Sequence, residues 1–226
     1  MAQFTGFLPE TIDFLWELRM NNHKAWMEEN RERYRRVLKE PFDALSAELT
    51  QRLLAEMSDL QMEYAVSRIN RDVRFSKDKS PYKARKWVVL KEPAMMTGQW
   101  KTRPVFYFEL MPEGYECGMG FYEGKSAYMQ AFRRKIDAAP KRFARLAGAL
   151  AKHTEFQLYG ECYKRPMGKG GYPPEIMEWY QRKTLGLSMS RPVDERLFSA
   201  DLIDFVLQEW KKLEPMYRFL REIPTE

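Results

Sequence analysis

The sequence is poor in the residues on which disulfide frameworks and many metal sites depend. In 226 residues it has two cysteines, Cys117 and Cys162, and two histidines, His23 and His153. A secreted chain held together by disulfides carries more cysteines, and two histidines far apart in the sequence do not make a His-rich metal site. We therefore expect a cytoplasmic protein without such a metal site.

Long apolar runs and nucleophile motifs are missing too. No apolar run approaches the ~18–20 residues of a membrane span, and Met1–Pro9 lacks the basic and apolar regions of a signal peptide. The sequence contains no G-x-S-x-G elbow. No motif indicates a cofactor; a carboxylate-only magnesium site stays compatible with the sequence, although no short acidic cluster marks one.

The glycines between residues 118 and 126 come close to two phosphate-binding motifs. The spacing of Gly118, Gly120 and Gly124 misses both the P-loop and the dinucleotide fingerprint by one residue. Two interpretations of Gly124-Lys125-Ser126 stay open: a phosphate at a helix N-terminus, or a glycine turn that ends in a serine cap.

The composition is that of a folded chain, with 44% hydrophobic and 14% aromatic residues. No linker rich in Pro, Gly or Ser divides it, so we expect a single domain over residues 1–226. Hydrophobic spacing predicts helices first, then strands, then helices with returning strands. This order indicates an α+β fold with a mostly antiparallel sheet flanked by N-terminal and C-terminal helices. The predicted helices cover 8–18, 24–38, 41–57, 128–136, 140–150, 175–183 and a stretch from 201, and the predicted strands cover 64–69, 84–91, 104–110, 115–122, 156–163 and 185–189.

The positive charge is concentrated in one short stretch. Residues 68–86 contain eight cations and two acids, an excess of six that equals the net charge of +6 for the whole chain. Charge gathered in this way attracts anions. Within this stretch, and in a late loop, we predict the side chains that bind a ligand. They are Arg71, Arg74, Ser76, Lys77, Lys79, Ser80, Tyr82 and Lys83, with Lys164 and Arg165 from the late loop.

Each residue type in the basic stretch suits an anion in its own way. Arginine presents a planar fork to phosphate or carboxylate, lysine a point charge, and turn hydroxyls and amides further donors. Asp72 and Asp78 are the candidate catalytic residues, as acid/base groups or magnesium ligands. The alternative is a solvated loop whose charges pair internally while Phe75 and Tyr82 anchor it to the core.

Residues 71–83 read Arg-Asp-Val-Arg-Phe-Ser-Lys-Asp-Lys-Ser-Pro-Tyr-Lys. This run resembles the signature of an uncharacterised bacterial and fungal family, the domain of unknown function 2461. Other pieces match in order, although Met27 stands where the family usually has Phe. The resemblance implies a fold and a site, and it implies no reaction. The other matching pieces are Asn21-Asn22 with Trp26 and Tyr34, Gly120-Phe121-Tyr122, and Lys164-Arg165-Pro166 with Gly168.

Two functions from different classes follow from the same charges. In the first, the basic stretch and the late loop form a pocket for a phosphorylated or carboxylated small molecule, in a binding domain or an enzyme. In the second, the charges form an open face that binds nucleic acid without catalysis, with Phe75, Tyr82 and Trp87 interleaved for stacking. A third alternative is a structural protein whose loop packs against a partner. The acids among the cations favour the pocket, and the sequence leaves the oligomeric state open.

Overall fold

The computed structural model describes residues 3–74, 77–93, 102–121, 126–165, 167 and 171–224. The chain divides into two compact units. The first unit consists of Met1–Leu90, Phe108–Glu116 and Ser190–Leu207, and the second of Lys91–Tyr107, Cys117–Met189 and Gln208–Glu226. The expectation of a single domain over residues 1–226 stays a prediction.

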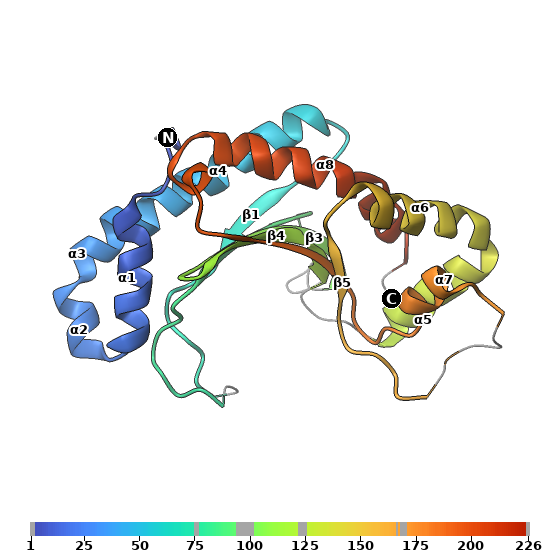
Figure 1. Ribbon diagram of the computed structural model, residues 1–226, viewed down its shortest axis with the longest axis horizontal. Helices are drawn as coiled ribbons and strands as arrows, with labels where there is room; N and C mark the ends of the chain where they lie inside the picture. The colour runs from blue at the N-terminus through green and yellow to red at the C-terminus, as the bar shows by residue number, and fades with distance from the viewer. Residues whose placement is uncertain are drawn as a thin grey trace. The chain divides into compact units, whose positions relative to one another are not determined.

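The described strands form one six-stranded sheet in the order β1-β2-β3-β4-β6-β5. Together with the helices before and after them, they confirm the α+β fold with an antiparallel sheet (Figure 1). In β3, Phe106, Phe108 and Leu110 are fully buried whereas Tyr107 and Glu109 are partly exposed. Because successive side chains of a strand point to opposite faces, Glu109 lies on the less covered face. The strands are β1 (Glu63–Val66), β2 (Lys86–Lys91), β3 (Pro104–Met111), β4 (Gly114–Phe121), β5 (Gln157–Tyr159) and β6 (Gly186–Pro192).

Every predicted strand has a counterpart, with shifted ends. The strand expected at 104–110 is β3 almost residue for residue. The strand expected at 156–163 pairs with Gly186–Ser188 of β6 over Gln157–Tyr159, and an isolated bridge between Cys162 and Arg182 follows. Of the strand expected at 115–122, Tyr122 lies outside the described residues.

The N-terminal helices of the first unit follow one another from α1 to α4 (blue to cyan in Figure 1). The prediction of one continuous helix over 24–38 was wrong, because the chain ends a helix at Asn30. The Asn30 side-chain amide donates to the Trp26 carbonyl at 2.9 Å, beside the ordinary helical hydrogen bond from its own backbone N–H at 3.0 Å. The side chain thus competes with the backbone for a carbonyl at the end of α2. The helices are α1 (Pro9–Met20), α2 (Lys24–Glu29), α3 (Arg31–Tyr34), a π-helical turn η1 (Arg35–Lys39) and α4 (Glu40–Glu56).

A line of aromatic rings forms the core of the first unit. Ring centroids lie 5.3 Å apart for Phe4 and Phe7, and 5.9 Å for Phe7 and Phe42. The line continues from Phe42 to Phe108 at 6.1 Å and from Phe108 to Tyr115 at 5.8 Å. Such ring pairs add about 0.5–1.5 kcal/mol each beyond the area that they bury. They fix α4 against β3 and β4.

The second unit packs its helices around Phe143. Its ring meets Trp179 and Phe132 edge-on, at 5.5 and 5.6 Å, and Phe219 at 5.4 Å. The described helices are α5 (Ser126–Ala138), α6 (Pro140–His153), α7 (Pro174–Tyr180) and the later part of α8 (Asp201–Arg221). None of the helices in the described ranges is long and apolar enough to cross a membrane.

Candidate anion-binding site

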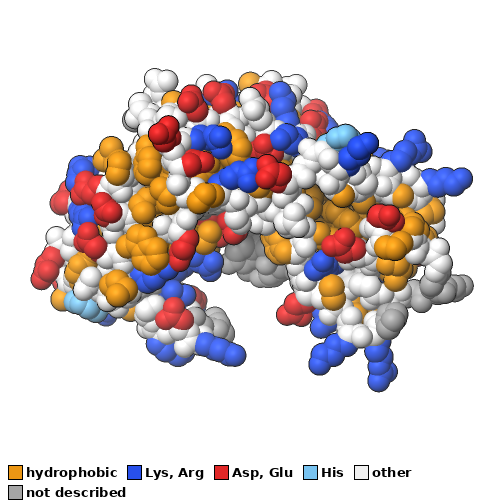
Figure 2. Space-filling view, viewed as in Figure 1, with side chains coloured by type: hydrophobic (Ala, Val, Ile, Leu, Met, Phe, Trp, Pro, Cys, Tyr) orange, Lys and Arg blue, Asp and Glu red, His pale blue; other side chains and the backbone are white. Residues whose placement is uncertain are grey.

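The basic stretch forms a long loop between β1 and β2 whose two arms pair with each other. Asn70 and Tyr82 form an isolated antiparallel bridge. The Arg71 N–H donates to the Pro81 carbonyl at 2.8 Å, and the Lys83 N–H donates to the Ile69 carbonyl at 2.9 Å. Paired arms hold the base of the loop in place, so the charges near residues 68–71 and 82–85 are positioned by backbone hydrogen bonds. Figure 2 shows Lys and Arg side chains, in blue, gathered around this loop.

Asn22 anchors the loop to the N-terminal helices. Its side-chain amide donates to the Tyr82 carbonyl at 3.0 Å, and its carbonyl oxygen accepts the Tyr82 N–H at 3.0 Å. The Tyr82 side chain is 7% exposed and so belongs to the core. Two separate runs of the sequence, Asn21-Asn22 and the basic stretch, therefore meet in the structure.

At the tip of the loop, charges pair with one another. Two nitrogens of the Arg74 guanidinium donate to Asp72 at 2.7 and 2.9 Å, and Arg71 lies 2.8 Å from Asp78. The Lys79 amine donates to the Val73 carbonyl at 2.8 Å. These contacts are the internal pairing expected of a solvated loop. They involve mainly the exposed residues of the basic stretch.

The two aspartates at the tip are held in their ionised form. Hydrogen bonds from Arg74, first from its side chain and then from its backbone, lower the pKa of Asp72 to about 2. The Ser80 backbone N–H, which donates to Asp78 at 2.9 Å, lowers the pKa of Asp78. Carboxylates with lowered pKa values are weak proton acceptors near neutral pH. The catalytic role expected for Asp72 and Asp78 stays a prediction.

At the base of the loop, three alternate residues lead into β2. The Lys83 amine lies 4.4 Å from the centre of the Trp87 ring, and the Arg85 guanidinium lies 5.5 Å from it. Alternate residues of an extended segment share a face, so these side chains gather beside Glu109 of the neighbouring strand. Arg85 Nη1 lies 3.2 Å from Glu109 Oε1.

Positive charge dominates around Lys83. Burial lowers the pKa of the Lys83 amine, and the positive charges of Arg85, Arg71 and Arg68 lower it further, against the opposing charge of Glu109. Arg71 also pairs with Asp78 and Arg85 with Glu109, so Lys83 and its three arginines share two carboxylates and are short of negative charge. A bound anion would supply that charge.

Glu109 lies inside β3 with its side chain 16% exposed. Burial raises its pKa, and the charge of Glu116 raises it further, whereas Arg85 opposes this change. Although Oε1 is within ion-pair distance of Arg85, it is buried and makes no hydrogen bond to any residue in the described part of the chain. Arg85 Nη1 is close to this oxygen, but its N–H does not point toward it, so the two groups form an ion pair without a hydrogen bond. Because this oxygen has no exposed surface, the nearby charge of Arg85 is what offsets it.

The predicted ligand-binding residues separate into groups. Lys83 and Arg71 are half-buried at the base of the loop, whereas Arg74, Lys77 and Lys79 are exposed at its tip. Ser80 accepts a hydrogen bond at its carbonyl from Arg71 Nε at 3.2 Å.

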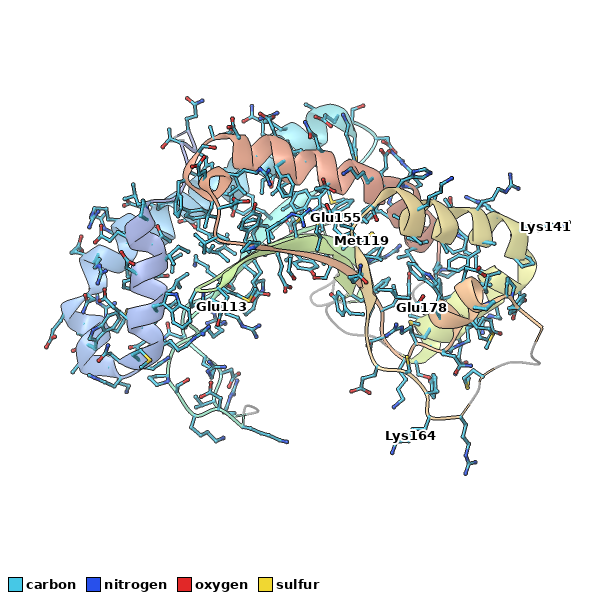
Figure 3. The ribbon with its side chains drawn as sticks, viewed as in Figure 1. Glu113, Met119, Lys141, Glu155, Lys164 and Glu178 are labelled. Atoms are coloured by element: carbon cyan, nitrogen blue, oxygen red, sulfur yellow. The ribbon has the colours of Figure 1, made fainter. Side chains whose placement is uncertain are left out.

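Other sequence predictions fall on the second unit or on residues that are not described. Lys164 and Arg165 are exposed residues of the second unit, and the Lys164 side chain points away from its loop (Figure 3). Their part in one pocket with the basic stretch stays a prediction. Ser76, Phe75, Tyr122, Gly124, Lys125, Pro166 and Gly168 lie outside the described residues. In the described ranges, no three His, Cys, Asp or Glu side chains are grouped so as to hold a metal ion.

The described residues around the basic stretch also include Asn22, Arg68, Arg85, Trp87 and Glu109, which were not among the predicted site residues. The alternation of Lys83, Arg85 and Trp87 ahead of a predicted strand was a readable signal, because it places three side chains on one face. Glu109 had a weaker signal, as one charge within an otherwise apolar and aromatic strand.

The fold and this cluster define an α+β protein that gathers cations beside strands β2 and β3 of an antiparallel sheet. The chain belongs to the family of conserved hypothetical proteins DUF2461, whose model matches residues 10–219. No curated protein matches the chain in sequence.

Proposed function

We propose that the first unit binds an anionic small molecule through four cations, Arg68, Arg71, Lys83 and Arg85, which we term the base cluster. The observation that carries the proposal is the half-buried Lys83 amine, whose pKa is lowered by the charges of these three arginines and opposed by Glu109. With the Arg71–Asp78 pair included, the four cations share two carboxylates. A bound phosphate or carboxylate would relieve the repulsion among the cations and accept their hydrogen bonds.

The exposed part of the Glu109 side chain narrows the class of ligand. This side chain is 16% exposed and lies beside Arg85. A ligand that carries a hydroxyl next to its phosphate or carboxylate would satisfy both groups at once. The proposal is therefore a phosphorylated or carboxylated small molecule that also bears hydroxyl groups. It assigns binding and no reaction, since the low pKa of Asp72 suits charge pairing better than proton transfer.

Nucleic acid is the less favoured ligand. Single-stranded nucleic acid needs aromatic faces on which bases stack, and the Trp87 ring already has Lys83 and Arg85 beside it. Tyr82 is buried. We also propose a cytoplasmic location, which suits the exposed free thiol of Cys162.

A thermal-shift screen tests the proposal. Phosphate, sulfate, sugar phosphates, dicarboxylates and a short single-stranded oligonucleotide are each added to the wild type and to a Lys83→Gln/Arg85→Gln variant. A Lys24→Gln/Arg31→Gln variant is the matched control, because it removes two exposed cations of the same types from the same unit. A ligand present at about 100 times its Kd raises the free energy of unfolding by about 2.7 kcal/mol.

We expect hydroxyl-bearing anions to raise the Tm of the wild type and of the control, and to leave that of the base-cluster variant unchanged. An equal rise in all three proteins would overturn the proposal. A response to the oligonucleotide alone would replace it with nucleic-acid binding.

A further inference from the structure

The second unit contains a cavity of about 290 Å³ whose described lining is entirely charged. Its walls are Glu92, Arg103, Arg218, Arg221 and Glu222. This volume is close to the lower end of the ~300–1,000 Å³ range of small-molecule sites. Such sites are usually mostly apolar, so three arginines in one small cavity need a physical reason.

Contacts at the end of α8 hold these walls in place. Arg103 Nη1 donates to the Arg221 carbonyl at 3.1 Å. Glu92 Oε1 accepts from Arg221 Nε at 2.5 Å and from the Tyr217 hydroxyl at 3.2 Å. The cavity is thus built on side chains that support one another, a feature of organised binding sites.

Side chains also offset the negative pole of α8 beside the cavity. The carbonyls of its last turn carry the partial negative charge of the helix dipole. Three of them accept hydrogen bonds from side chains: Phe219 from Lys135 at 2.6 Å, Leu220 from Tyr128 at 2.8 Å and Arg221 from Arg103. This helix end therefore repels an anion less than a helix end whose last carbonyls accept no hydrogen bonds from side chains.

The acids of the cavity have cations of their own. Glu222 lies 2.7 Å from Lys135 and 3.8 Å from Arg142, and Glu92 is held by Arg221. Arg218 Nε donates to Glu214 at 2.8 Å. Counted over the contacts named here, among the described residues, the charged walls and their ion-pair partners comprise five cations and three carboxylates. The local balance favours an anionic occupant.

We propose that this cavity is a second anion site, which holds the phosphate or carboxylate of a compact molecule between Arg103 and Arg218. Among the described residues Arg103 is engaged only through Nη1, so its remaining N–H groups suit the fork geometry of such anions. Arg221 serves as a positioning residue through Glu92. The site lies wholly within the second unit and does not depend on the base cluster.

Calorimetric titration with inorganic phosphate tests the second site. The starting protein is the full chain with Lys83→Gln/Arg85→Gln, so that the base cluster contributes nothing. Arg103→Gln/Arg218→Gln is then added to this protein. Arg145→Gln is the control, because Arg145 is an exposed arginine of α6 outside the cavity. Arg103→Lys keeps the charge and removes the fork, and it serves if the double substitution does not fold.

We expect the starting protein to bind phosphate, and the Arg103→Gln/Arg218→Gln protein to bind it at least about tenfold more weakly, since hydrogen bonds to charged groups dominate such sites. Arg145→Gln should leave binding unchanged, and Arg103→Lys should weaken it. If the folded starting protein gives no heat of binding with phosphate, the second-site proposal is wrong. The base-cluster proposal is not affected by that result. Equal binding by the cavity variants overturns it as well.

Discussion

Two lysines three residues apart, Lys83 and Lys86, lie in opposite surroundings. Lys83 faces other cations at the base of the loop, whereas Lys86 is 3% exposed and lies over the rings of Phe42 and Tyr34 at 5.6 and 6.0 Å. The Lys86 amine donates to the Ser67 carbonyl at 3.0 Å. Burial lowers its pKa to about 8; Asp43 opposes this change, and Lys39 and Lys83 add to it.

Stability should therefore depend on the ionisation of Lys86. The folded pKa of about 8 is below the ordinary value of 10.5, so between these values the unfolded chain binds the extra proton and the free energy of unfolding rises with pH. We expect the free energy of unfolding of the wild type, relative to that of Lys86→Met, to rise by about 2 kcal/mol from pH 7 to pH 9.5. Urea unfolding at several pH values measures it, and a difference that does not change with pH contradicts the assignment.

Asn22 should contribute more to stability than its neighbour Asn21. Asn22→Ala removes two hydrogen bonds and leaves the Tyr82 N–H without its partner, whereas the Tyr82 carbonyl keeps a hydrogen bond from Arg71 at 3.3 Å. The loss should lower the free energy of unfolding by about 1–3 kcal/mol. Asn21 is exposed, and its side chain donates only to the Glu17 carbonyl, so Asn21→Ala should cost about 0.5 kcal/mol. Urea unfolding of the two variants compares them directly, and equal losses would count against the anchoring role of Asn22.

At the scale of elements, alternation and helical spacing located the strands and most of the helices. They missed the break at Asn30 and the π-helical turn at Arg35–Lys39. Hydrophobic spacing alone does not fix such details, because a turn with one extra residue keeps Val37 and Leu38 buried as well as an α-turn would. The short β5 has the same explanation: how far a strand pairs depends on its neighbour, which a single segment does not reveal.

The turn between β3 and β4 requires glycine at position 114. Gly114 has φ +154°, and a Cβ there would lie 2.0 Å from the Arg191 carbonyl oxygen. A backbone oxygen cannot easily move aside, so Gly114→Ala should lower the free energy of unfolding by about 1–3 kcal/mol.

Gly148 in α6 has nothing within 4 Å of an added Cβ. Gly148→Ala should therefore stabilise the protein by about 0.5–1 kcal/mol. Thermal unfolding of both variants checks these opposite signs, and a Gly114→Ala variant as stable as the wild type would show that the turn tolerates a side chain.

At the scale of the whole molecule, the sequence located the excess positive charge and left its use open. The structure divides that charge into paired groups at the loop tip, such as Arg74 with Asp72, and less compensated groups at the base, such as Lys83. Sequence spacing did not predict this division, because it depends on Glu109, which is distant in the sequence. The cavity of the second unit was also beyond prediction, since Glu92, Arg103 and Arg218 come from separate segments.

The pKa of the Lys83 amine shows whether an anion binds at the base cluster. NMR titration of its ε-carbon, assigned with Lys83→Arg and compared with the exposed Lys24, reports the state of this one group with and without saturating phosphate. We expect the pKa of this amine to lie below its ordinary value without phosphate, and to rise when phosphate supplies the missing negative charge. A Lys83 pKa that does not respond to phosphate, or to any hydroxyl-bearing anion that raises the Tm, would contradict an anion site at the base cluster.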